Sequence, residues 1–142
     1  MDLSQIHLNF LLADVSRLMR RAFEQRLTDS PLTFAQVRVL IYATRNEGLR
    51  QIELAEMLEV QPITLARLVD QLVEARLVER RADPADRRAY QVYPTPAAQA
   101  HVEAIESLAA DIRREATAGL SKAQADAVTA ALEIMRNNLV AR

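Results

Sequence analysis

Residues 83–88, with the sequence Asp-Pro-Ala-Asp-Arg-Arg, restrict the fold of this chain more than any other segment. Asp83-Pro84 favours a turn, because proline presets φ for the second turn position and the Asp side chain can bond to the backbone beyond it. Residues 77–81 precede the turn, and residues 89–93 follow it as an alternating run with β-branched and aromatic side chains. The sequence therefore predicts a hairpin with a charged tip, which needs a neighbouring helical body because a lone two-stranded ribbon is marginally stable.

Two short helices are predicted just before this hairpin. Residues 51–58 and residues 62–75 carry apolar side chains at helical spacing, with three residues between the two segments. Pro62 suits the first position of the second helix, where its missing N–H costs nothing, and the small Ala55 allows a close helix crossing. The order of these elements indicates a helix-turn-helix followed by a hairpin wing.

Longer helices are predicted on the N-terminal side of this central part. The helix over residues 5–27 is apolar over more than one face, so it needs two packing partners, one of which can be another subunit. Thr33 and Gln36 form a capping box that opens the next helix, and Gly48 can close that helix as its C-cap.

Two further helices are predicted after the hairpin. Thr95 can cap the first of them, with Pro96 at its first helical position and Gly119 at its end. Ser121 and Gln124 form a second capping box. The last helix carries an apolar stripe with the coiled-coil spacing of four, three and four residues, at Val128, Leu132, Met135 and Leu139.

Length, charge and hydropathy narrow the class of protein. A chain of 142 residues fits a single domain, and no apolar run approaches the ~20 residues needed to cross a bilayer. The first ten residues lack the basic start of a secretory signal, so we expect a soluble, cytoplasmic protein. The net charge is −1, and binding to nucleic acid therefore requires a local basic surface rather than bulk attraction.

Catalytic and metal-binding chemistry finds little support in the composition. The chain has no cysteine, which removes disulfides, thiolate metal sites and thiol-based redox sensing. Its two histidines, His7 and His101, stand outside any ligand-spaced motif such as H-E-x-x-H. We therefore expect no enzyme, no catalytic residue, no metal and no cofactor.

Three segments, taken in order, resemble the MarR family of winged-helix transcriptional regulators over nearly the whole chain. The first segment is residues 32–40, and the third is the tip at residues 83–88. The second is the helix-turn-helix with the strand after it, where the matching positions are Leu54-Ala55, Thr64, Leu68-Val69 and 77–80. The resemblance implies a mainly α fold with a small β-hairpin wing. It further implies one domain over residues 1–142, in which residues 33–93 form the DNA-binding winged helix-turn-helix and residues 1–30 and 95–142 form the helical dimerisation part.

The chain departs from the family pattern around the wing. The family usually has Gly where this chain has Arg76, so Arg76 must adopt left-handed geometry or the helix must end differently. After the wing the family tends to show Leu-Thr and then Gly, whereas this chain has Pro94-Thr95 and then Ala98. These departures bear on the hinge and the angle of the wing more than on DNA chemistry.

The start of the second short helix supplies the predicted base-reading residues. Arg67 can grip guanine with two hydrogen bonds, Gln61 can pair with adenine, and Thr64 offers a hydroxyl or a methyl. Pro62 and Ile63 can meet a thymine methyl. The alternative is that these are ordinary solvated helix positions, and the order of motifs favours DNA contact over it.

The predicted wing would bind DNA by electrostatic attraction in the minor groove. A narrow minor groove concentrates negative potential, which attracts an inserted arginine. The resemblance points to Arg88 as that residue, to Asp86 as the carboxylate that holds it, and to Arg87 as a phosphate contact. The alternative is a surface salt bridge worth ~0–1 kcal/mol. Gln51 and Arg81 are further predicted phosphate contacts.

The resemblance implies a homodimer that reads a pseudo-palindrome, with half-sites one helical turn, about 34 Å, apart. Its predicted function is a transcriptional regulator, and a repressor in particular. The expected dimer interface lies in the terminal helices, at Ile6, Phe10, Val128, Leu132, Met135 and Leu139.

The resemblance also implies release of DNA by a small phenolic or carboxylic effector. The candidate residues are His7, Arg17, Arg21 and Tyr42, although a surface or interface position for the first three and a core position for Tyr42 explain them more simply. A second function class is a winged helix that binds protein instead of DNA. Residues 61–93 permit it, because they carry six arginines against five acidic residues, a net charge of +1.

Overall fold

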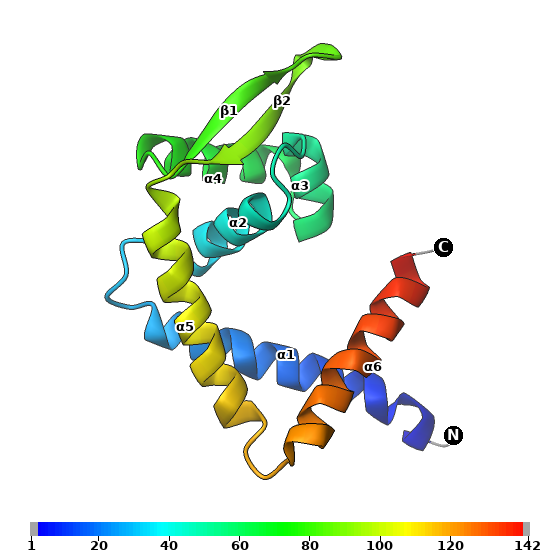
Figure 1. Ribbon diagram of the computed structural model, residues 1–142. Helices are drawn as coiled ribbons and strands as arrows, with labels where there is room; N and C mark the ends of the chain where they lie inside the picture. The colour runs from blue at the N-terminus through cyan, green and yellow to red at the C-terminus, as the bar shows by residue number, and fades with distance from the viewer. Residues whose placement is uncertain (1–2, 141–142) are drawn as a thin grey trace.

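The computed structural model describes residues 3–140 and confirms the mainly α fold with a β-hairpin (Figure 1). The short segments predicted from the sequence are found at residues 51–58 and 62–74, with Pro62 at the first helical position as expected. The elements in chain order are a 3-10 helix Leu3–Ile6, α1 His7–Arg26, α2 Phe34–Arg45, α3 Gln51–Leu58, α4 Pro62–Glu74, β1 Val78–Asp83, β2 Asp86–Pro94, α5 Ala98–Ala116 and α6 Lys122–Val140.

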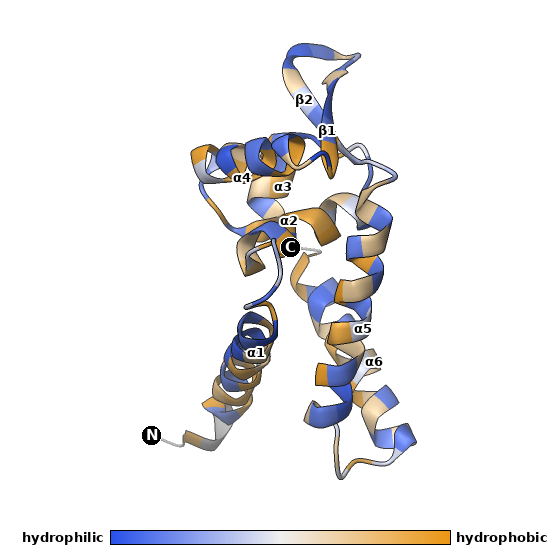
Figure 2. Cartoon of the chain, turned by 90° about the vertical axis from the view of Figure 1, so that its left-hand side faces the viewer, coloured by the Kyte–Doolittle hydropathy of each residue, from blue (hydrophilic) through white to orange (hydrophobic). Residues whose placement is uncertain are grey.

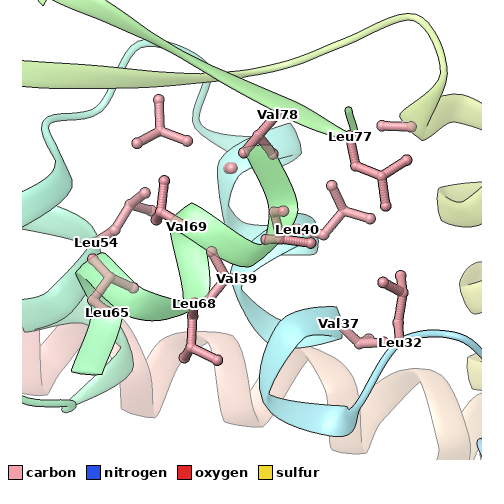
Figure 3. Packing of buried hydrophobic residues seen from close by; sticks show 14 of the residues in the cluster. Leu32, Val37, Val39, Leu40, Leu54, Leu65, Leu68, Val69, Leu77 and Val78 are labelled. Carbon is pink, nitrogen blue, oxygen red and sulfur yellow. The ribbon is translucent and has the colours of Figure 1, made fainter. Parts of the chain in front are cut away.

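The hydrophobic core lies in the helix-turn-helix half of the chain (Figure 3). Leu40 of α2, Leu54 of α3, and Leu65 and Val69 of α4 are completely buried against one another. Burial of each such side chain stabilises the fold by about 1.5–3 kcal/mol. The base of the hairpin joins the same core through Val78, so the wing and α4 are fixed to one body.

Two predicted capping boxes are confirmed. The Thr33 backbone N–H donates to Gln36 Oε1 at 2.9 Å, and the Gln36 N–H donates to Thr33 Oγ1 at 3.2 Å, at the start of α2. Ser121 and Gln124 make the same reciprocal pair before α6, at 2.9 and 3.1 Å. Both boxes are local in sequence and satisfy backbone donors that the first helical turn leaves free.

The predicted role of Gly48 as the C-cap of α2 is wrong. The helix ends at Arg45, and both the backbone N–H and the side-chain amide of Asn46 donate to the Tyr42 carbonyl. Gly48 lies two residues further on, at φ +85°, and donates to Val92 O at 3.2 Å. A Cβ atom at this position would lie 2.8 Å from Tyr93 Oη, and the positive φ would strain any residue with a side chain, so both features favour glycine.

The predicted cap of α5 by Thr95 is also wrong. The helix begins at Ala98, and Thr95 Oγ1 instead donates to the Arg76 carbonyl at 2.7 Å. That carbonyl is available because Arg76 has φ +62° and ends α4 in a Schellman motif. In this motif Leu77 N donates to Leu72 O and Arg76 N to Val73 O, both at 2.9 Å.

The wing is an antiparallel hairpin that the helical body supports from one side. Arg80 pairs with Val92 and Arg81 with Gln91, and a register irregularity falls between Ala82 and Asp83. The loop before α3 adds an isolated bridge between Arg50 and Gln91, with Val92 N donating to Leu49 O at 3.0 Å. This loop therefore extends the two-stranded ribbon, which alone is marginally stable.

The long helices leave most of their apolar surface uncovered. Within residues 3–140, neither α1 nor α6 contains a buried residue, although both carry many apolar side chains. Helix α1 crosses α5 and packs against it (Figure 1), and Figure 2 shows α6 standing apart from α1. No helix in the described part of the chain is long and apolar enough to span a membrane.

Candidate nucleic-acid interface

Helix α4 exposes the predicted base-reading residues at its N-terminus. Gln61 is the N-cap residue, and its side chain makes no capping bond and is exposed. Pro62 and Arg67 are exposed, and Thr64 is half-buried. The first turn contains no acidic residue, so the positive end of the helix dipole is not neutralised there.

The opposite side of α4 fixes the direction in which these residues point. Leu65, Leu68, Val69 and Leu72 are all buried at helical spacing in the core. In addition, the Gln36 side-chain amide of α2 donates to Gln71 Oε1 at 2.9 Å. The helix is therefore held rigidly, with Gln61 and Arg67 directed to solvent.

The wing tip presents two exposed arginines, Arg87 and Arg88. Asp86 Oδ1 accepts a hydrogen bond from the backbone N–H of Arg88 at 2.9 Å. Asp86 therefore holds the backbone that carries Arg88, and the contact of Arg88 with DNA stays a prediction. Arg88 lines a concavity of about 200 Å³ together with Gln51 and Tyr90.

The carboxylate that fixes the wing is Asp83, which the sequence had not assigned to the site. Asp83 is 7% exposed, and its Oδ1 accepts from the Ala85 N–H at 2.8 Å while its Oδ2 accepts from Arg50 Nε at 2.6 Å. The Ala85 hydrogen bond, and after it the Arg50 guanidinium, hold the pKa of Asp83 below its usual value. The same pair raises the pKa of Arg50.

A second arginine that the sequence had not assigned, Arg80, connects three elements. Its Nε donates to Gln51 Oε1 of α3 at 2.9 Å, and its Nη2 donates to Ala66 O of α4 at 3.1 Å. The same Nη2 lies 2.6 Å from Asp70 Oδ1. Gln51 is thus fixed by its side-chain oxygen at the start of α3.

Arg81 points to the other face of the hairpin, because adjacent strand residues alternate. Its guanidinium donates to Glu79 Oε1 at 2.8 and 2.6 Å and stacks on Tyr93, 3.8 Å from the ring centroid. The Glu79 hydrogen bonds raise the pKa of Arg81. The structure does not bring Arg81 to the surface shared by Gln51 and Arg88, and its phosphate contact stays a prediction.

The four predicted effector residues do not form one site within the chain. His7, Arg17 and Arg21 are exposed on α1, and Arg17 lies 3.6 Å from Asp14. Tyr42 instead lines a cavity of about 190 Å³ between α1, α2 and α5. His7 precedes Phe23, which lines this cavity, by sixteen residues, about 24 Å along the helix axis.

The predicted dimer-interface residues lie on exposed helix faces. Phe10 of α1 is 61% exposed, and Leu139 of α6 is 73% exposed. Ile6, Val128 and Leu132 are exposed as well, and Met135 is half-buried. Ile6 ends the 3-10 helix before α1, and the other side chains belong to α1 and α6, which contain no fully buried residue within residues 3–140. The structure therefore leaves these faces free to pack on another molecule.

Within residues 3–140, no three His, Asp or Glu side chains are placed to hold a metal ion. The arrangement instead presents an exposed helix N-terminus and an arginine-tipped hairpin, both fixed to one core. A helix-turn-helix followed by such a hairpin defines the chain as a winged helix-turn-helix protein.

Comparison with known proteins identifies the family. Residues 30–89 match the model described as the MarR family. The transcriptional regulator PA3341 is 34% identical, with a TM-score of 0.79, and the match covers 96% of this chain and 100% of that one. The chain belongs to the MarR family of DNA-binding transcriptional regulators, whose members are regulators rather than enzymes.

Two other solved structures are similar. The apo form of wild-type MarR from E. coli is 27% identical, with a TM-score of 0.79, and the match covers 90% of this chain and 95% of that one. BpsR from Bordetella bronchiseptica is 27% identical, with a TM-score of 0.75, over 91% of this chain and 98% of that one. The DNA binding of BpsR is regulated by 6-hydroxynicotinic acid.

Proposed function

We propose that this chain is a homodimeric repressor that binds a pseudo-palindromic operator in double-stranded DNA. The observation that carries the proposal is the placement of two kinds of surface (Figure 1). Figure 1 shows α4 and the hairpin at one end of the chain and α1 and α6 at the other. The first group of elements carries exposed Arg67, Arg87 and Arg88, and the second carries uncovered apolar faces. A dimer formed through the second surface would carry two copies of the first.

The division of the chain follows from the same placement. We propose that residues 33–93 contact DNA and that residues 1–30 and 95–142 form the dimer. A large exposed apolar surface on a regulator is expected to be covered by a partner, and a second copy offers the same apolar helices. The stripe of Val128, Leu132, Met135 and Leu139 is the proposed centre of this contact.

In the proposed complex, α4 enters the major groove and the wing reaches the adjacent minor groove. Arg67 and Gln61 supply donors suited to guanine and adenine, with Thr64 and Pro62 beside them. Arg88 supplies charge to a narrow minor groove, with its backbone held by Asp86. Gln51 and Arg87 are the proposed phosphate contacts.

Repression is proposed because a dimer that covers its operator excludes other proteins sterically and needs no further contact to do so. The test is selection of genomic fragments by the wild-type protein, followed by transcription from a promoter that contains the selected sequence. The proposal expects an inverted repeat with centres about one helical turn apart and less transcript when the protein is added. Fragments without a shared repeat, or more transcript, would contradict it.

An aromatic carboxylate is the proposed effector class. The cavity beside Tyr42 is also lined by two aromatic residues, Phe23 and Phe34. Its charged lining residues are two arginines, Arg38 and Arg45, and one acidic residue, Glu106. A cavity of about 150 Å³ accommodates benzene, so about 190 Å³ leaves room for one substituted ring. The response of BpsR to 6-hydroxynicotinic acid has the same chemistry. We therefore assign the effector to this cavity rather than to His7, Arg17 and Arg21.

A competition assay tests the effector. Titration of 6-hydroxynicotinic acid into the protein–operator complex is expected to release DNA, and Tyr42→Ala with Arg38→Ala is expected to weaken this release. The matched control is Arg17→Ala, which removes a cation from α1 outside the cavity. Equal release from all variants, or none from the wild type, would remove the effector site from the proposal and leave operator binding untouched.

A further inference from the structure

Ile63 is the most exposed large apolar side chain in the described part of the chain, at 81%. It is the second residue of α4, directly after Pro62, and the core residues of this helix all lie on the other side. An isoleucine left in water gains nothing from the fold, because its stabilisation comes from removal of apolar area from solvent. The fold therefore provides no reason for an isoleucine at this position.

The surroundings of Ile63 indicate what it meets. Gln61 precedes it, and Arg67 follows one helical turn later on the exposed side of α4. Most other exposed apolar side chains of the chain lie on α1 and α6, where a second copy can cover them. Ile63 lies instead among polar and cationic groups at the positive end of a helix, where the occupant must be anionic overall and apolar locally.

The major groove of DNA meets both requirements. Its edge carries hydrogen-bonding groups from all four bases, and its apolar group is the C5-methyl of thymine. We propose that Ile63 contacts a thymine methyl in each half-site and so selects a T·A pair there. The inference rests on the proposed function, and it adds a base preference that hydrogen-bonding residues alone do not supply.

The spacing along α4 places this thymine relative to the rest of the half-site. Ile63 and Arg67 are four residues apart, which is about 6 Å along the helix axis. Successive bases are 3.4 Å apart along one strand. The thymine selected by Ile63 is therefore expected within about two base pairs of the guanine selected by Arg67.

Replacement of thymine by deoxyuridine tests the contact, because it removes only the methyl and leaves pairing with adenine intact. Each thymine of the selected operator is replaced in turn, in both half-sites, and affinity is measured by fluorescence anisotropy at fixed salt. The wild type is expected to lose about fourfold in affinity per methyl at one position of the half-site, the equivalent of about 0.8 kcal/mol for one methyl-sized group. Ile63→Ala is expected to bind the thymine and uracil duplexes equally.

Two controls separate this contact from other effects. Val73→Ala makes a similar truncation on α4 about 15 Å further along the helix, and it should retain the wild-type response to uracil. Circular dichroism should be unchanged for Ile63→Ala, because the side chain is exposed.

The outcomes distinguish this inference from the proposed function. If the wild type binds the operator with the same affinity after every replacement, the methyl contact is overturned. The same follows from a thymine preference that Ile63→Ala retains, or from a sensitive thymine far from the guanine that Arg67 selects. In each of these cases salt-dependent operator binding would persist and the proposed function would stand. A wild-type protein that binds no duplex would overturn both.

Discussion

Arg50 Nε, at the start of α3, lies 2.6 Å from Asp83 Oδ2, at the end of the first wing strand. The two residues are 33 positions apart in sequence, and Asp83 is the buried partner. The same carboxylate receives the Ala85 N–H, so one side chain both shapes the tip and ties it to the helix-turn-helix. The pair thereby sets the direction in which Arg87 and Arg88 point.

Removal of either Arg50 or Asp83 should weaken operator binding, although neither residue is proposed to touch a base. Arg50→Ala is the cleaner variant, because it leaves the Asp83–Ala85 hydrogen bond intact. We expect a several-fold loss in affinity for Arg50→Ala and for Asp83→Ala, and a double variant no worse than the poorer single one, since the two changes break one interaction.

The matched control is Asp126→Ala, which breaks an exposed ion pair with Lys122 on α6, where the N–O distance is 3.0 Å. It should leave the affinity unchanged. Additive losses from Arg50→Ala and Asp83→Ala, measured by anisotropy with the same operator, would show that the two residues act separately and not as a positioning pair.

The Asp83 pair should be insensitive to pH near neutrality. The pKa of Asp83 in the folded protein lies below its usual value of about 3.9. The stabilisation from this carboxylate is therefore complete above about pH 4 and is lost as the pH falls through the lower, folded-state value. The Ala85 amide shift, followed by NMR, should titrate with a midpoint below 3.9, and a midpoint above that value would contradict the assignment.

Arg76→Gly should make the protein more stable. Arg76 has φ +62°, and left-handed geometry costs a side-chain-bearing residue roughly 1–2 kcal/mol. Glycine removes this strain but gives the unfolded chain more freedom, which offsets part of the gain. We expect an increase of about 0.5–1 kcal/mol in the free energy of unfolding, measured by urea denaturation. The Thr95 bond to the Arg76 carbonyl is to the backbone and should persist; a less stable variant would contradict this account.

Leu139→Glu together with Met135→Glu should produce monomers that no longer bind the operator. The two changes place charges on the exposed apolar stripe of α6, where a partner helix is proposed to pack. Burial of an unpaired charge is strongly unfavourable, so the contact should be lost. Sedimentation velocity gives the oligomeric state. The control is Glu133→Gln, which replaces a charged side chain on the same helix with an uncharged one of similar shape. Dimers that survive the double change would place the interface elsewhere.

The sequence predicted features whose partners lie close together along the chain. The capping boxes of Thr33 with Gln36 and of Ser121 with Gln124 join residues three positions apart, and the Asp83 turn forms within two residues. The apolar periodicity of residues 51–74 likewise predicted helix positions and the buried side of α4.

Contacts between distant segments could not be read in the same way. Arg80 reaches Gln51 across 29 residues, and nothing in the local pattern distinguishes it from its neighbour Arg81, which faces the other side. Thr95 resembles a helix cap, but the left-handed Arg76 presents a carbonyl that it bonds instead. The sequence marked Arg76 as an unusual residue at the end of its helix, but it did not predict that the Arg76 carbonyl would accept a hydrogen bond from Thr95.

The salt dependence of DNA binding is the decisive measurement for the proposed binding of DNA through the wing. The measurement is the affinity of wild-type protein for duplex DNA across a salt series, beside Arg88→Ala and the control Lys122→Ala, which removes a cation from the exposed start of α6. We expect a steep fall of log K with log salt for the wild type and the control, and a weaker affinity with a slope smaller by about one for Arg88→Ala. A wild-type affinity that does not depend on salt, or an Arg88→Ala variant with the wild-type affinity and slope, would contradict it.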